Sequence, residues 1–214
     1  IDNLTPTNCD AVIGHSIITT VIGITLPRLT AEREESSNMT ENITVVFELL
    51  KGVSKILNII APWTKTRLFM SRSDYFKVDP NKLDLEVGAA LARLDALNDD
   101  IVASIDIEQH RINKGAISIL RQCFCRFADN RDPGSVLAFL AAVDKEFVHC
   151  LRCRHSFPVM ILMHWGVLLD KLDGHTWWAR NSGKALVSEL LMVLPHGDHR
   201  WEDARLWPKQ KLGL

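Results

Sequence analysis

Apolar residues recur every three to four positions along most of the chain, which is the spacing of one helical face. The first such pattern extends from Cys9 to Leu26 and includes Val12, Ile13 and Val21. Similar patterns occupy residues 45–60, 80–97, 101–128, 133–151, 156–172, 176–194 and 201–208. No stretch combines strict alternation with enrichment in β-branched residues, as a strand would. The sequence predicts an all-α fold, a single compact bundle of about seven to nine helices.

Several short signals predict where these helices begin and end. Pro27 should end the first helix, because proline lacks the backbone N–H and disfavours helix in the residue before it. Asp79-Pro80 and Asp132-Pro133 each combine a capping side chain with a proline suited to the first helical position. Asp173-Gly174 should separate the last two long helices. Residues 29–41, which are polar and acidic, should form a flexible loop within one domain spanning residues 1–214.

Length and charge exclude some functions. The chain has 214 residues, of which 47% are hydrophobic and 24% charged, with a formal net charge of -1. It has no basic excess to neutralise phosphates, so we expect no direct nucleic-acid binding. Val12–Leu26 is the longest apolar stretch, and His15 and several hydroxyl residues interrupt it. It is too short and too polar for a membrane span, so we expect none.

Cysteine and histidine residues raise the question of a metal site. Cys123 and Cys125 are two residues apart, so they cannot share a helix face. Cys150 and Cys153 are three apart and can share one, but a single pair does not close a structural zinc site. The sequence therefore predicts buried or half-buried free thiols, with no metal site and no cofactor.

Helical enzymes that act on apolar diphosphates would share this composition. Such terpene synthases hold magnesium between an aspartate-rich helix and an Asn/Ser/Glu helix. Here Asn98-Asp99-Asp100 lacks the third acid, and Ala185 interrupts the pair formed by Asn181 and Glu189. No nucleophile signature or phosphate-binding loop is present either. We expect that the chain is not an enzyme and has no catalytic residues.

The segment from Phe157 to Leu194 consists of two apolar helical patterns with tryptophans at their junction. Together with the 133–151 pattern, these helices could enclose an apolar cavity. His164 could hydrogen-bond a ligand hydroxyl there, or could be a core histidine satisfied by a neighbour. Of the adjacent residues Trp177 and Trp178, we expect one ring to be buried and the other to lie at the rim of the core. The candidate ligand-binding residues are Phe139, Leu140, Val143, Met160, Met163, His164, Val167, Trp177 and Leu186.

Four segments resemble, in order, one family of regulators. They are LTPTNCDAVIGHSII, VVFELLKGVSKIL, MHWGVLLDKLDGHTWWARNSGKALVSEL and WEDARLWPKQKLG. They resemble the C-terminal regulatory domain of fungal zinc-cluster transcription factors of the sterol uptake control type. The resemblance implies an all-α ligand-sensing domain in a transcription activator, with the DNA-binding zinc cluster upstream of Ile1. It implies a hydrophobic, sterol-like ligand and ligand-dependent movement between cytoplasm and nucleus.

Two other functions are compatible with the same residues. The domain could pack solid and serve only homodimerisation or intramolecular masking, with regulatory proteins as partners. It could also be a helical enzyme of unrecognised type acting on apolar substrates. A mostly apolar cavity would favour the sensor, and a core at normal packing density would favour the structural role.

Overall fold

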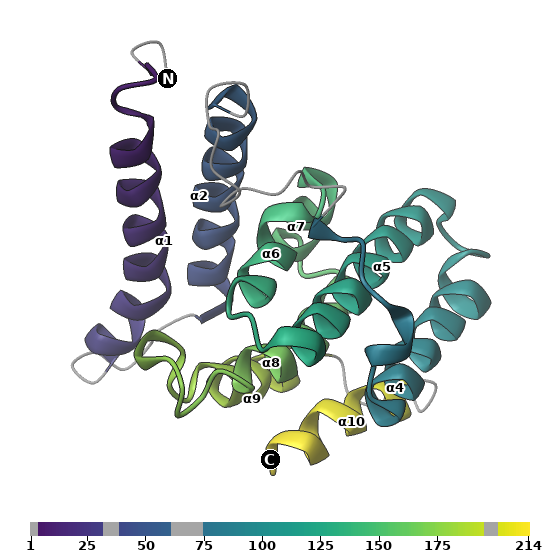
Figure 1. Ribbon diagram of the computed structural model, residues 1–214. Coiled ribbons are helices and arrows are strands. Elements are labelled where there is room, and N and C mark those ends of the chain that lie inside the picture. The colour runs from purple at the N-terminus through teal and green to yellow at the C-terminus, as the bar shows by residue number, and fades with distance from the viewer. Residues whose placement is uncertain (1–3, 32–38, 61–74, 195–200) are drawn as a thin grey trace. The chain divides into compact units, whose positions relative to one another are not determined.

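The computed structural model describes residues 4–31, 39–60, 75–194 and 201–214 (Figure 1). These residues contain nine α-helices and no strand, so the predicted all-α fold is confirmed. The chain divides into two compact units, Ile1–Lys77 and Val78–Leu214. That the whole chain acts as one regulatory domain stays a prediction.

The first unit contains helices α1 (Cys9–Ala31) and α2 (Met39–Ile60), which pack side by side (Figure 1). Helix α1 continues past Pro27, so the predicted end is wrong. Proline removes one hydrogen bond, but its own φ near about −65° is helical, and the chain can continue after it. The predicted loop at 29–41 is shorter than expected, because its two ends belong to α1 and α2. The remaining residues, 32–38, lie outside the described residues.

The second unit is arranged around helix α8 (Ser156–Asp170). The other helices are α4 (Leu85–Leu97), α5 (Ile107–Asn130), α6 (Gly134–Ala142), α7 (Lys145–Arg152), α9 (Ser182–Val193) and α10 (Glu202–Leu212). Helix α8 contacts α5, α6, α7, α9 and α10. Every residue from Phe157 to Leu169 is buried, so α8 is apolar all round because other helices surround it.

Two of the predicted helix starts are displaced towards the C-terminus. Asp79 and Pro80 begin only a short 3-10 helix, η1 (Pro80–Lys82). Helix α4 begins at Leu85, because the Asp84 carboxylate accepts hydrogen bonds from the backbone N–H groups of Glu86 and Val87. Similarly, the helix predicted from 101 begins at Ile107, capped by Asp106. It is preceded by a π-helical turn, η2 (Asn98–Val102).

Two predicted helices are interrupted. The pattern over 133–151 is split into α6 and α7, because Val143 and Asp144 are extended, with ψ of 151° and 158°. The pattern from 176 begins with a 3-10 turn, η3 (Trp177–Ala179). Asn181 then adopts a left-handed conformation with φ of 56°, and α9 starts at the next residue. The apolar spacing therefore predicts the helix on each side of the break correctly, but non-helical backbone conformations interrupt the helices between them.

Candidate functional site

The candidate ligand-binding residues lie mostly in the core of the second unit. Eight of them have a fractional exposure of at most 2%: Phe139, Leu140, Val143, Met160, Met163, His164, Val167 and Leu186. Trp177 is 72% exposed, whereas Trp178 beside it is buried. The two tryptophans thus divide as predicted, and Trp177 lies apart from the other candidates.

Helices α8 and α9 approach each other through two glycines. A Cβ atom on Gly166 would lie 2.6 Å from Val187 Cγ2. A Cβ atom on Gly183 would lie 2.6 Å from the Gly166 carbonyl oxygen and 2.8 Å from Asp170 Cα. Ordinary carbon contacts are about 3.5–4.0 Å, so neither position has room for a methyl group. A ligand therefore cannot lie between α8 and α9 at this crossing, which is one part of the region between three helices where the cavity was predicted.

The face of α8 that meets α6 is filled by aromatic rings. Phe139 stacks on Trp165 with ring centroids 6.2 Å apart, and contacts Phe147 edge-on at 6.0 Å. The Trp165 indole N–H donates a 2.9 Å hydrogen bond to the Val136 carbonyl oxygen. These contacts satisfy the one polar atom of the cluster and fix the rings. Here too the candidate residues form a packed core.

His164 faces a different neighbour, the Trp207 ring of α10. The two rings stack with centroids 5.2 Å apart and an interplanar angle of 22°. The His164 Nδ1 lies 2.9 Å from the Met160 carbonyl oxygen. A carbonyl oxygen only accepts, so the imidazole proton must be on Nδ1. Nε2 then carries a lone pair, and no hydrogen-bond partner for it lies within the described part of the chain.

The protonation state of His164 follows from its surroundings. Burial lowers the pKa of its imidazole to about 4, and the Arg93 charge contributes in the same direction, while the hydrogen bond to Met160 opposes both. The imidazole is therefore neutral at neutral pH. A neutral, buried imidazole with a free lone pair can accept a hydrogen bond from a hydroxyl group, but it cannot pair with an anion.

Trp207 is itself anchored from α4. Its indole N–H donates a 3.0 Å hydrogen bond to Glu86 Oε1, and the Lys211 ammonium lies 2.5 Å from Glu86 Oε2. Hydrogen bonds from Lys211 and then Trp207 hold the pKa of the Glu86 carboxyl below its usual value. Glu86 thus holds two residues of α10, and with them the ring that covers His164. Neither Trp207 nor Glu86 could be linked to His164 from the sequence, because both are far from it in the chain.

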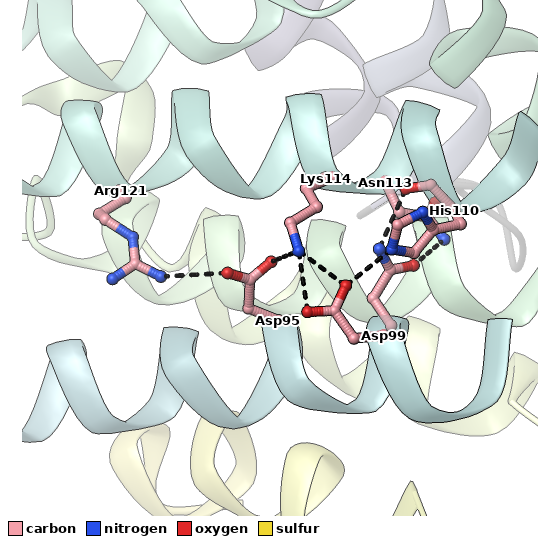
Figure 2. A network of polar contacts seen from close by, with 7 residues as sticks. Asp95, Asp99, His110, Asn113, Lys114 and Arg121 are labelled. Atoms are coloured by element: carbon pink, nitrogen blue, oxygen red, sulfur yellow. Dashed lines mark hydrogen bonds and ion pairs between the residues drawn. The ribbon is translucent and has the colours of Figure 1, made fainter. Parts of the chain in front are cut away.

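A second group of polar residues joins α4 and the turn η2 to α5 (Figure 2). The Lys114 ammonium lies between two carboxylates, 2.7 Å from Asp99 Oδ1 and 3.9 Å from Asp95 Oδ1. His110 Nε2 lies 2.7 Å from the same Asp99 oxygen. Hydrogen bonds from His110 and then Lys114 lower the pKa of the Asp99 carboxyl. Asp99, one of the two acids considered as a magnesium motif, is therefore paired with side chains of α5.

Beneath this surface cluster, three buried amides form a hydrogen-bonded chain. Gln109 Nε2 donates to Asn113 Oδ1 at 2.8 Å, and Asn113 Nδ2 donates to Asn98 Oδ1 at 2.9 Å. Asn98 Nδ2 donates to the His110 carbonyl oxygen at 3.0 Å. Each side chain in this series has a hydrogen-bond partner in the next, so the three amides hold η2 against α5.

The cysteines are free thiols, as predicted, and all except Cys153 are buried. Burial raises the pKa of the Cys123, Cys125 and Cys150 thiols. Within the described ranges, no three residues among His, Cys, Asp and Glu gather closely enough to hold a metal ion.

Comparisons of the chain with protein-family models, with curated proteins and with solved structures find no match. The resemblance to fungal zinc-cluster regulators therefore remains an expectation from the sequence. Among the described helices, none combines the length and apolar character that crossing a bilayer requires.

Proposed function

We propose that this chain is a regulatory domain that binds an apolar molecule bearing a hydroxyl group, and that His164 accepts a hydrogen bond from that hydroxyl. The observation that carries the proposal is the buried Nε2 atom of His164, which has no partner among the described residues. An unsatisfied buried polar group costs about 1–3 kcal/mol. A ligand hydroxyl would remove that cost, and the apolar residues around His164 would suit the rest of the molecule.

The site would lie where α8 meets α10, away from the glycine crossing with α9. There, a ligand hydroxyl would meet Nε2 in the plane of the imidazole, and the rest of the ligand would need room beside the Trp207 ring that stacks on its face. Ligand binding would then shift the population of α10 positions and change which surface the domain offers to partners. The ligand must bind the two arrangements unequally for this to happen.

The resemblance to sterol uptake regulators makes a sterol the first ligand to test. A sterol combines a large apolar body with one hydroxyl, which matches a single acceptor in an apolar core. On this proposal the domain belongs to a fungal transcription activator, moves between cytoplasm and nucleus, and leaves DNA binding to another part of the protein.

The experiment compares ergosterol with the ketone in which its hydroxyl is oxidised. The purified protein should bind ergosterol more tightly, because a ketone cannot donate to Nε2. His164→Leu should lose this preference while still binding apolar molecules. His175→Leu, which changes an exposed histidine, is the matched control and should keep it. Equal binding of alcohol and ketone by the unchanged protein would contradict the proposal.

A second function is favoured by the dense packing at Gly166 and Gly183 and by the contacts of the Phe139, Phe147 and Trp165 rings. In this case the domain binds no ligand and serves dimerisation or masking of another protein surface. Mass spectrometry of lipids extracted from the purified protein separates the two functions. A stoichiometric sterol favours the sensor, whereas a lipid-free protein that also fails to bind added sterol favours the structural role.

A further inference from the structure

The C-terminal end of α7 carries a histidine and a cysteine whose reactive atoms converge. His149 and Cys153 are four residues apart, and both are exposed. The Cys153 Sγ atom lies 3.7 Å from His149 Nε2. Neither residue belongs to the site around His164, and the inference below does not depend on a sterol ligand.

Local backbone structure holds this pair in place. The Cys153 N–H donates to the His149 carbonyl oxygen at 3.0 Å, which continues the helical geometry to Cys153. Arg154 then adopts a left-handed conformation with φ of 56°, and the His155 N–H donates to the Cys150 carbonyl oxygen at 3.0 Å. The helix is thus closed by a hydrogen-bonded turn directly after the cysteine.

The separation of the two atoms matches the edge of a tetrahedral metal site. Zinc binds thiolate sulfur at about 2.3 Å and imidazole nitrogen at about 2.0–2.1 Å, which places the two donors about 3.5 Å apart at a tetrahedral angle. The observed 3.7 Å needs only a small adjustment of exposed side chains. The pair also lies at the end of α7 where the helix dipole favours a cation.

We propose that His149 and Cys153 form a chelating site for Zn²⁺ with two protein ligands. His149 Nε2 and Cys153 Sγ bind the ion, the thiol proton passes to solvent, and two water molecules complete the tetrahedron. Such an open site exchanges its metal, unlike a closed four-ligand structural site. The neighbouring thiol of Cys150 is buried, so it takes no part.

The exposure pattern of the cysteines provides a direct assay. Cys153 is the exposed thiol, and the other four cysteines of the chain are buried, so iodoacetamide should alkylate Cys153 first. Zn²⁺ should protect Cys153 from alkylation in the folded, full chain. His149→Ala should raise the Zn²⁺ concentration for half-protection by at least about tenfold, as loss of a metal-site group does. His175→Ala, at another exposed position, should leave it unchanged.

A second measurement uses Co²⁺ as a spectroscopic probe. The reduced protein should show the visible bands of tetrahedral cobalt and a thiolate charge-transfer band, with one ion per chain. Cys153→Ser should remove the charge-transfer band. Protection that survives His149→Ala, or a stoichiometry of one ion per two chains, would overturn the proposal.

Discussion

The close approach of α8 and α9 predicts that Gly183 cannot be enlarged. In Gly183→Ala, the new Cβ would lie 2.6 Å from the Gly166 carbonyl oxygen and 2.8 Å from Asp170 Cα. Both are backbone atoms, so a side-chain rotation cannot relieve the contact. The helices would have to separate by about 1 Å to restore an ordinary contact distance.

The magnitude follows from two opposing effects. Overpacking of a close helix contact costs about 1–3 kcal/mol, and a backbone clash falls at the upper end. Replacement of glycine by alanine in a helix regains up to about 1 kcal/mol. We expect Gly183→Ala to lower the free energy of unfolding by about 2 kcal/mol and the Tm by about 4–8 °C.

The matched control is Gly115→Ala in the middle of α5, where a Cβ would meet nothing within 4 Å. This variant should be stabilised by about 0.5–1 kcal/mol. Urea denaturation followed by tryptophan fluorescence is a suitable assay, because five of the six tryptophans lie in Val78–Leu214. If Gly183→Ala proved as stable as Gly115→Ala, the inferred close crossing of α8 and α9 would be incorrect.

Three further predictions concern the same unit. Trp165→Ala should lower the free energy of unfolding by about 3–5 kcal/mol in urea denaturation, because it leaves a cavity where a buried ring was. Trp177→Ala, at an exposed position, should change it by less than about 0.5 kcal/mol. Similar losses in the two variants would contradict the difference in burial. The pKa of His164 is lowered to about 4 in the folded protein, so between about pH 6.5 and 4 the unfolded chain binds more protons than the folded one. The free energy of unfolding should therefore decrease by up to about 3 kcal/mol as the pH falls through this range. His164→Leu should remove this part of the pH dependence, and an unchanged slope would show that His164 is not the group responsible. Asp106→Ala, which removes the α5 cap, should cost about 1 kcal/mol by thermal denaturation, and no loss would contradict the capping role.

The sequence was sufficient to predict the helices and their buried faces, because the spacing of apolar residues along a helix can be read from neighbouring positions in the chain. It was insufficient for the breaks. Asp79-Pro80 is a strong local start signal, but Asp84 caps the long helix instead, and the first buried residue of α4 is Val87. The interruption at Val143 and Asp144 has no proline or glycine to mark it.

The candidate site was predictable only in part. His164 stands out as a polar residue within an apolar helix, and its burial agrees with either interpretation made from the sequence. Trp207 could not be linked to it, because the contact joins positions far apart in the chain. The glycine crossing was missed for a related reason. Gly166 and Gly183 become informative only when the two helices are placed together, and their contact excludes a ligand from one part of the region where a cavity was expected.

The central claim, that His164 Nε2 accepts a hydrogen bond from a ligand hydroxyl, is tested most directly by NMR of the imidazole nitrogens. Before ligand is added, Nδ1 should carry the proton and Nε2 should show the chemical shift of an unprotonated nitrogen. On saturation with ergosterol, the Nε2 signal should shift as expected for a hydrogen-bond acceptor, while Nδ1 stays protonated. An Nε2 signal that is unchanged at saturation, or that belongs to a protonated nitrogen from the start, would contradict the account.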